Sequence, residues 1–240
     1  MGTLFIVATP IGNLEDITIR AINALFSVDG IICEDTRKTG FLLRELQKRY
    51  PEFAKPQNGE KYQRMLSYYE QNEAERIPEV ITALKNDLNI ALVSDAGTPL
   101  ISDPGFKLVR ECVKEGIKVE SLPGASSPLV ALTLSGLPTD KFLFLGYPPR
   151  KAGNRTKFLQ GAKASQDDIS STMILFEAPH RLLKTLNELQ VVFGDIQIVI
   201  TRELTKIHEE VRHETISKAI THFKKSEPRG EFVLVFNTNV

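Results

Sequence analysis

A long loop between a predicted strand and a predicted helix is the feature that most constrains the fold of this 240-residue chain. An apolar run ends at Val93, and apolar residues at helical spacing resume at Leu108. Residues 94–105 between them are rich in glycine and proline, which permit close backbone approach and restrict backbone freedom. Most such loops need only about 2–6 residues, and in α/β folds they lie at the ligand-binding edge of the sheet. The pattern favours a rigid binding loop; an ordinary tight connection is the alternative interpretation.

The order of the predicted elements indicates an α/β fold with two domains. Up to about residue 135, apolar runs alternate with amphipathic helical patterns, which is typical of a mostly parallel sheet with flanking helices. After the segment 136–140, several apolar runs follow with few helical patterns between them, which favours a mixed sheet. We therefore expect an N-terminal domain over residues 1–138 and a C-terminal domain over residues 139–240.

Three local predictions concern the first half of the chain. Asp103 is a plausible N-cap of the helix after the long loop, with Pro104 at its first position. A helix is expected over about residues 36–48, after a short strand. Residues 50–61 are polar and contain prolines and a glycine, which predicts a surface loop.

The charge balance limits how this chain could bind nucleic acid. Lysine plus arginine and aspartate plus glutamate each number 30, so the formal net charge is zero and a whole-surface cationic field is excluded. Nucleic acid would therefore have to bind a local basic patch. Residues 141–166 contain no acidic residue but several basic ones, with Tyr147 and Phe158 among them. This stretch predicts either a contact surface for RNA phosphates or a flexible, solvated loop.

Other features favour a protein that is neither secreted, membrane-spanning nor metal-dependent. Cys33 and Cys112 lie far apart in apolar patterns, which is typical of reduced intracellular cysteines. Because we find no targeting signal and no apolar run of the roughly 18 residues that a membrane span needs, we expect a soluble, cytoplasmic protein. His208 and His213 are five residues apart, unlike the pair of a zinc-binding helix, and we expect no metal site. The dinucleotide-binding and Walker A glycine motifs are also absent.

Four loops rich in small residues each follow a predicted strand. They comprise residues 8–16, 33–37, 94–105 and 123–127. Each loop by itself is a weak signal. Because parallel strands place their carboxyl ends at one edge of a sheet, the four loops together would line a single cleft.

These loops and three later strings resemble a known family. The matching strings are ATPIGNLEDI, CEDTRKT, SDAGTPLISDPG, LPGASSP, FEAPHRL, RELTKIHEE and RGEF, and they are spread over nearly the whole chain. In this order and spacing they resemble the tetrapyrrole-methylase superfamily of S-adenosylmethionine-dependent methyltransferases. Within that superfamily, the chain is most similar to the bacterial enzymes that methylate a cytidine ribose of small-subunit ribosomal RNA.

The resemblance carries expectations about fold, ligands and partners. It implies two α/β domains, S-adenosylmethionine in the cleft between them, and a homodimer. It also implies methyl transfer to the 2′-hydroxyl of a cytidine in the decoding region, with small-subunit ribosomal RNA or the 30S subunit as partner. The implied cofactor-binding residues are Pro10, Gly12, Asn13, Leu14, Ser94, Asp95, Ala96, Gly97, Thr98, Pro99, Ile101, Ser102, Gly124, Ser126 and Ser127.

A ribose hydroxyl becomes a good nucleophile only when a base removes its proton, and a positioned base typically contributes about 10²–10⁴-fold. The candidate catalytic residues are Asp35, Glu177 and His180. Glu177 could instead cap the helix that follows it, and several of the arginines could form structural ion pairs. The candidate RNA contacts are Arg37, Arg150, Lys151, Arg155, Arg181 and Arg202.

Two other functions stay open on the sequence. One is carbon methylation of a corrin precursor by the same fold, and the other is a non-catalytic ribosome-binding factor that kept the cofactor fold. The FEAPHRL and RELTK strings and the basic stretch favour RNA as the substrate.

Overall fold

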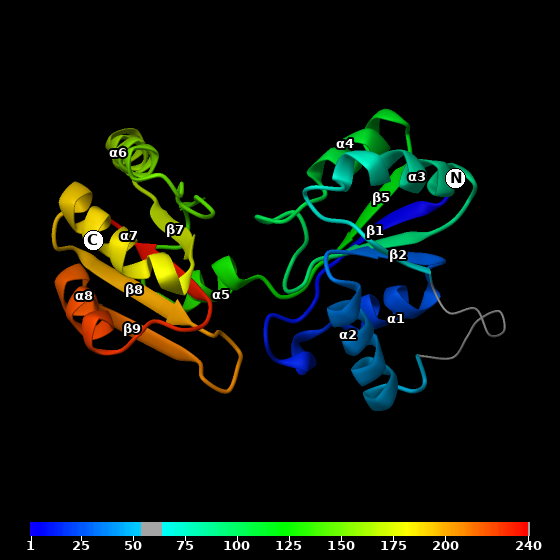
Figure 1. Cartoon of the computed structure of the whole chain (residues 1–240), viewed down its shortest axis with the longest axis horizontal. Helices are drawn as coiled ribbons and strands as arrows, with labels where there is room; N and C mark the ends of the chain where they lie inside the picture. Colours follow the sequence, from blue (N-terminus) through cyan, green and yellow to red (C-terminus); the bar gives the residue numbers. More distant parts are fainter. Residues whose placement is uncertain (54–63, 240) are drawn as a thin grey trace. The chain divides into compact units, whose positions relative to one another are not determined.

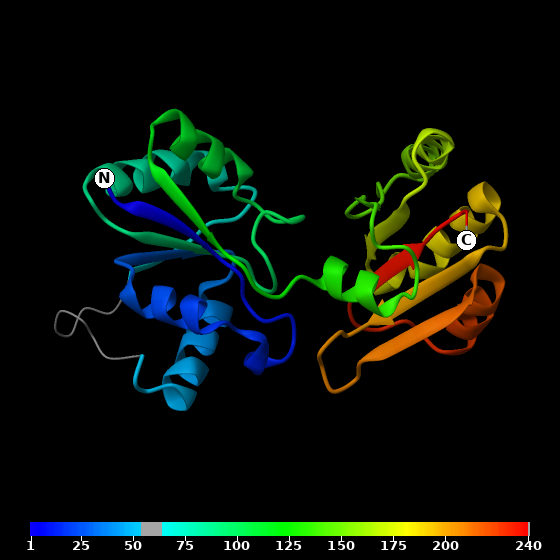
Figure 2. The ribbon, with the colours of Figure 1, turned by 180° about the vertical axis from the view of Figure 1, so that it is seen from behind.

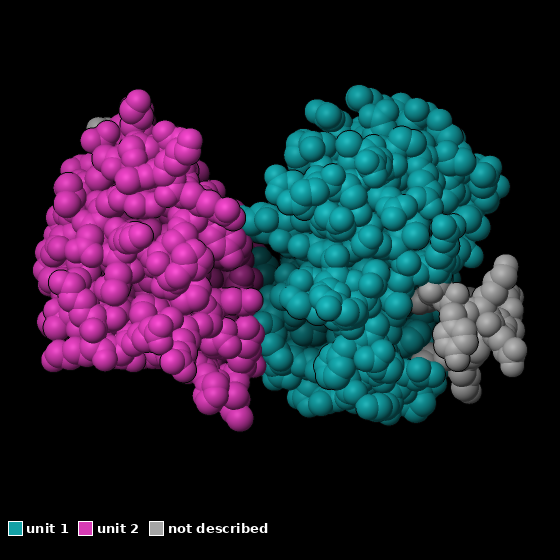
Figure 3. Space-filling model, in the orientation of Figure 1, with its two compact units in different colours: residues 1–126 teal, residues 127–240 magenta. Residues whose placement is uncertain are grey.

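The computed structural model describes residues 1–53 and 64–239. The chain forms two compact units, Met1–Ser126 (unit 1) and Ser127–Val240 (unit 2), shown in Figure 3. Most of the surface loop predicted over residues 50–61 lies outside the described residues. Within the described ranges, no helix combines the length and apolarity needed to cross a bilayer.

Unit 1 contains a five-stranded sheet in the order β3–β2–β4–β1–β5. Every neighbouring pair in it is parallel, which confirms the predicted sheet type. The strands are β1 (Thr3–Val7), β2 (Gly30–Cys33), β3 (Arg64–Ser67), β4 (Ile90–Val93) and β5 (Lys118–Leu122). The helices are α1 (Ile19–Ser27), α2 (Thr36–Arg49), α3 (Glu73–Lys85) and α4 (Phe106–Lys114), with a short 3₁₀ turn η1 (Leu14–Asp16).

Helices cover both faces of the unit 1 sheet. Figures 1 and 2 show α1 and α2 on one face and α3 and α4 on the other. Val7 and Val93 pack in the cluster of buried side chains with α1 and α2, whereas Leu4 and Leu92 pack in the cluster with α3 and α4. Because successive side chains of a strand alternate between the two faces, both faces need apolar residues, and the strands read as continuous apolar runs.

Helix boundaries in unit 1 follow local capping. The Asp35 side chain accepts a hydrogen bond from the backbone N–H of Arg37, so α2 begins at Thr36 as predicted. The predicted start of α4 at Asp103 and Pro104 is wrong, since the N-cap is Gly105. Gly105 has a φ of 132°, a conformation that side chains with a Cβ rarely adopt, so the chain turns there before it can enter the helix.

Unit 2 contains a mixed sheet in the order β6–β7–β10–β8–β9, as expected. β6 runs parallel to β7, and the other neighbouring pairs are antiparallel. The strands are β6 (Phe142–Phe144), β7 (Thr172–Glu177), β8 (Gln197–Arg202), β9 (Glu210–Thr215) and β10 (Phe232–Phe236). The helices are α5 (Ser127–Leu134), α6 (Ala152–Asp168), α7 (Pro179–Phe193) and α8 (Ile216–Lys225).

Two differences from the sequence predictions concern unit 2. The units divide after Ser126, before the boundary expected at residue 138, because α5 packs on β7 and β10 and thus groups with unit 2. Helices α6 and α8 were not predicted. In α6 the buried apolar residues include only Leu159 and Ala162 among many polar ones, so helical periodicity is weak there and packing on α7 decides the structure.

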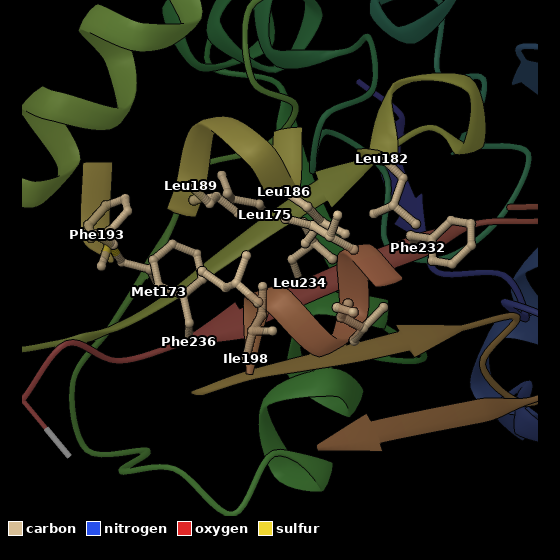
Figure 4. Packing of buried hydrophobic residues seen from close by; sticks show 14 of the residues in the cluster. Met173, Leu175, Leu182, Leu186, Leu189, Phe193, Ile198, Phe232, Leu234 and Phe236 are labelled. Atoms are coloured by element: carbon tan, nitrogen blue, oxygen red, sulfur yellow. The ribbon is translucent and has the colours of Figure 1, made fainter. Parts of the chain in front are cut away.

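The core of unit 2 lies between its sheet and the helices α7 and α8. Figure 4 shows Phe232 of β10 beside Leu182 of α7. At the other end of the cluster, the rings of Phe236 and Phe193 lie 5.2 Å apart. The five residues of β10 are all buried, since α5 covers the opposite face of the sheet. Full burial of each such side chain contributes about 1.5–3 kcal/mol.

Candidate active site

The loops after β1 and β4 meet at the carboxyl edge of the unit 1 sheet. Thr9 and Gly97 form an antiparallel bridge through two backbone hydrogen bonds with N···O distances of 2.9 and 3.0 Å. The hydroxyl of Thr9 also donates to the carbonyl oxygen of Ser94 at 3.3 Å. The first and third loops of the predicted set are therefore joined directly.

The loop after β5 joins the same edge. The hydroxyl of Thr98 donates to the carbonyl oxygen of Ala125 at 3.0 Å. A Cβ on Gly124 would lie 2.8 Å from the Cβ of Ala8, so only glycine allows this approach of the loops after β5 and β1. Gly97 has a φ of 82°, which also favours glycine.

The loop after β2 completes the set. The backbone N–H of Asp35 donates to a carboxylate oxygen of Asp95 at 3.2 Å, and the Nζ of Lys38 contacts the other oxygen at 2.6 Å. All four predicted loops therefore converge within unit 1, as parallel strands require.

The loop after β4 contains strained backbone. Leu100 and Ser102 have φ angles of 72° and 67°, although neither is a glycine. Residues held in this region cost about 1–3 kcal/mol each, and such strain clusters at functional sites.

A buried carboxylate holds the end of this strained loop. Glu73, which is 3% exposed, accepts hydrogen bonds from the Tyr68 hydroxyl at 2.8 Å and from the backbone N–H of Gly105 at 3.1 Å. It also pairs with the Nζ of Lys107 at 3.0 Å. Burial raises the pKa of Glu73, but the hydrogen bonds from Lys107, Tyr68 and Gly105 outweigh it and leave the pKa below its usual value.

Two neighbouring carboxyl groups at this edge have pKa values that are shifted in opposite directions. Burial, with the negative charges of Asp103 and Asp95, raises the pKa of Glu34 to about 7. Hydrogen bonds from Arg37 lower the pKa of the neighbouring Asp35 well below its usual value. Among the residues that the structure describes, no three His, Cys, Asp or Glu side chains are grouped to hold a metal ion.

Glu34 is a candidate that the sequence analysis missed. One of its carboxylate oxygens is buried and has no hydrogen-bond partner within the described part of the chain. In the sequence, Glu34 could have been found from its position directly after the apolar strand β2, where the loops of a ligand-binding edge begin. The alternation of a strand places Glu34 on the opposite side from Cys33, toward the loop after β4 that contains Asp103.

The predicted cofactor-binding residues lie in or next to these loops. Pro10, Gly12, Asn13 and Leu14 follow β1, and the side chain of Asn13 caps η1 by accepting from the N–H of Glu15. Gly97 and Pro99 are buried within the loop after β4. The more accessible members of this loop are Asp95, Ala96, Ile101 and Ser102. Gly124 and Ser126 end unit 1, whereas Ser127 begins α5 of unit 2.

Glu177, a predicted catalytic residue, is buried inside unit 2. It is 1% exposed, and its carboxylate accepts hydrogen bonds from the backbone N–H of Ala178 at 2.8 Å and from the hydroxyl of Thr185. Arg181 pairs with it at 3.3 Å. This arrangement favours a structural role over a catalytic one, because the carboxylate lies under α7 and bonds to residues of that helix and of its N-cap. His180 is exposed at the second position of α7.

The predicted RNA contacts divide into internal and exposed groups. Arg155 is only 4% exposed and pairs with Glu188, so the prediction that it binds RNA on the surface is wrong. Arg181 donates to the carbonyl oxygen of Pro148 and pairs with Glu177. It therefore forms a structural ion pair, which was the alternative to an RNA contact. Arg202 pairs with Glu210 at 3.1 Å. The exposed residues are Arg37, Arg150 and Lys151.

Comparison with known proteins shows the family of this chain. The model of the Tetrapyrrole (Corrin/Porphyrin) Methylases matches residues 3–220. The chain belongs to this family. A protein of Thermotoga maritima, named ribosomal RNA small subunit methyltransferase I, is 44% identical over 99% of each chain. A protein of the same name from Hydrogenobaculum is 46% identical, over 98% of this chain and 95% of its own.

A solved structure gives the same fold at low sequence identity. It is the uroporphyrin-III C-methyltransferase of Thermus thermophilus complexed with S-adenyl homocysteine. Its TM-score is 0.62 at 16% identity, covering 98% of this chain and 97% of that chain. The tetrapyrrole-methylase fold predicted from the sequence strings is therefore confirmed.

Proposed function

We propose that this chain is an S-adenosylmethionine-dependent methyltransferase acting on small-subunit ribosomal RNA, at the ribose 2′-hydroxyl of a cytidine. The observation that carries the proposal is the convergence of four loops at one edge of the unit 1 sheet, fixed by the Thr9–Gly97 bridge and the Thr98–Ala125 hydrogen bond. The names of the relatives with more than 40% identity support the RNA substrate. Because ribosomal RNA is the substrate, we place the enzyme in the cytoplasm.

The edge of unit 1 fits a compact, polar cofactor. Gly97 and Gly124 bring backbone groups close together, and the strained loop after β4 is held in one shape by Glu73. S-adenosylmethionine, when bound, supplies a methyl group already activated on a sulfonium sulfur. The protein therefore contributes mainly orientation, for which the ceiling is about 7–11 kcal/mol. Ser126 adds a hydroxyl at the end of the loop after β5.

Glu34 is our candidate for the residue that accepts the proton of the ribose hydroxyl. A base works best when its pKa lies near the operating pH, and Glu34 meets this condition with a pKa of about 7. Asp35 is a weaker base because Arg37 holds its pKa low. Glu34→Gln should reduce kcat at least tenfold, whereas Asp35→Asn should act mainly through α2, whose first turn Asp35 caps. The pH dependence of kcat checks the assignment: an unchanged acidic limb in Glu34→Gln would contradict it.

Methyl transfer is tested directly with tritiated S-adenosylmethionine. We expect label in small-subunit ribosomal RNA, either as naked RNA or in 30S subunits. We also expect the backbone at the modified ribose to resist alkaline cleavage. Label in a tetrapyrrole instead would favour the corrin-precursor reaction. Calorimetry with S-adenosylhomocysteine separates both from a non-catalytic ribosome-binding factor, since a chain without cofactor affinity cannot be a methyltransferase.

Two parts of the proposal concern partners. Arg37, Arg150 and Lys151 remain candidate RNA contacts because their side chains are exposed. A homodimer stays a prediction from the family resemblance, and sedimentation equilibrium measures it.

A further inference from the structure

We propose that the solvent-facing side of α2 is a docking surface for single-stranded RNA, which rests on the proposed function of the edge from which α2 starts. The surface consists of Arg37, Phe41, Arg44 and Lys48, and we call it the α2 strip. These positions are spaced i, i+4, i+7 and i+11, so they share one face of the helix. All four residues are exposed.

The opposite side of α2 explains why the strip faces solvent. Thr39 and Leu46 are buried, and Leu42 and Leu43 pack against the apolar cluster of unit 1. With 3.6 residues per turn, Leu46 points away from the strip. From its first to its last residue the strip extends about 16 Å along the helix axis.

The strip is basic in a chain without net charge. The charged residues of α2 are the basic Arg37, Lys38, Arg44, Lys48 and Arg49 and the acidic Glu45. No carboxylate lies within salt-bridge distance of Arg44 in residues 1–53 and 64–239. Arg37 and Lys48 pair with Asp35 and Glu45. Their side chains are 90% and 71% exposed, and exposed pairs contribute only about 0–1 kcal/mol, so phosphates can replace these carboxylates.

An exposed aromatic ring distinguishes the strip from an ordinary solvated helix face. Phe41 is 60% exposed, between Arg37 on one side and Arg44 on the other. Large apolar side chains at the surface often mark interaction sites when polar residues surround them. An unpaired base stacks on such a ring, and arginines beside it hold the backbone phosphates, which is how proteins bind single-stranded nucleic acid. Bases inside a duplex are not available for this stacking.

The position of α2 connects the strip with the proposed active site. The helix begins at Thr36, directly after the loop in which Asp35 contacts Asp95. The strip therefore starts at the edge where the four loops meet and leads away from it along the helix. RNA bound on the strip would enter the site from one side, next to Glu34.

The two kinds of contact predict different experimental signatures. The probe is a short, fluorescently labelled single-stranded RNA with the decoding-region sequence, and anisotropy measures its binding at several salt concentrations. Arg44→Ala combined with Lys48→Ala should make the negative slope of log affinity against log salt shallower by about 1.4, since each phosphate contact contributes about 0.7 for single strands. Phe41→Ala should weaken binding roughly fivefold or more without changing this slope.

A matched control exists on the other face of the sheet. Lys114 of α4 pairs with Glu111 at i,i+3, as Lys48 does with Glu45, and its side chain is 60% exposed. Lys114→Ala should change neither the affinity nor the slope. Thermal unfolding and S-adenosylhomocysteine affinity of each variant should match those of the unmodified protein, which separates RNA docking from folding and cofactor binding.

Two results would overturn the proposal in distinguishable ways. If the unmodified protein methylates ribosomal RNA but the strip variants bind the probe as well as Lys114→Ala does, the strip is not the RNA surface; it then serves a protein partner or only solvent. If the unmodified protein transfers no methyl group to ribosomal RNA, the proposed function is wrong, and the proposed role of the α2 strip, which rests on it, is wrong as well.

Discussion

Units 1 and 2 are both sheets covered by helices, but they use their polar residues in different ways. In unit 1 all strands are parallel, so the loops at their carboxyl ends collect at one edge and contact each other. In unit 2 most neighbouring strands are antiparallel, so their carboxyl ends are divided between two edges. Its buried charges are used in ion pairs such as Arg155–Glu188 and Arg181–Glu177. Strand direction thus decides where a site can form, and burial decides which charges stay available to it.

This difference between the units would not hold if the ion pairs of unit 2 did not stabilise its fold. Glu188→Ala should lower the free energy of unfolding by about 2–3 kcal/mol, because it leaves the guanidinium of Arg155 buried without its carboxylate. Chemical denaturation measures the change. Glu227→Ala, which removes an exposed pair with Arg229, should cost less than about 0.5 kcal/mol. Equal, small effects of both variants would mean that Arg155 does not depend on this pair.

The buried carboxylate of unit 1 should act on both stability and site shape. Glu73→Gln should cost about 2 kcal/mol at pH 7, because hydrogen bonds to a charged group are stronger than those to an amide. The folded pKa of Glu73 is depressed, so this stability is present above the usual pKa of 4.5 and is lost as the pH falls below it. The difference in stability between variant and unmodified protein should therefore be largest at pH 7 and should shrink as the pH falls below 4.5, which denaturation curves over this range measure.

The contact between the loops after β5 and β1 tests directly whether the convergence of the four loops forms the cofactor site. Gly124→Ala should cost about 1–2 kcal/mol, since its Cβ would meet that of Ala8. It should also weaken S-adenosylhomocysteine binding at least tenfold, measured by calorimetry. The control is Gly161→Ala on α6, where nothing lies within 4 Å of the added Cβ. This variant should be neutral or more stable by up to about 1 kcal/mol; unchanged cofactor binding in Gly124→Ala would contradict the convergence.

The smallest expected effect concerns Glu34 and has the opposite pH dependence from Glu73. The folded pKa of Glu34 is about 7, above its usual value of 4.5, so its contribution to stability is complete below 4.5 and is lost as the pH rises through 7. Glutamine resembles the protonated form. Glu34→Gln should therefore make the protein more stable at pH 8 by about 1 kcal/mol, after allowance for solvent screening, and leave it unchanged at pH 4. Denaturation curves at both pH values measure the difference; a stability gain at pH 4 would contradict it.

Much of the fold could be predicted from local patterns. Apolar runs that alternate with amphipathic helices predicted the parallel sheet, and the glycine- and proline-rich loops predicted which backbone segments would meet. Helix α6 could not be predicted, because its buried apolar residues are few and its helical structure depends on packing against α7. The boundary between the units depended on the packing of α5, which the composition of the segment 136–140 does not encode.

By itself, the sequence determined the order of strands and loops, and hence that four loops share one edge, because chain direction in a parallel sheet follows from local pattern alone. Only the tertiary structure decided the state of each charged group. Arg155 and Glu177 became internal because α7 packs over both: it brings Glu188 to the arginine, 33 residues away in the chain, and Thr185 to the carboxylate. Glu34 acquired its raised pKa from burial and from the carboxylates of Asp95 and Asp103, and such surroundings exist only once the chain has folded.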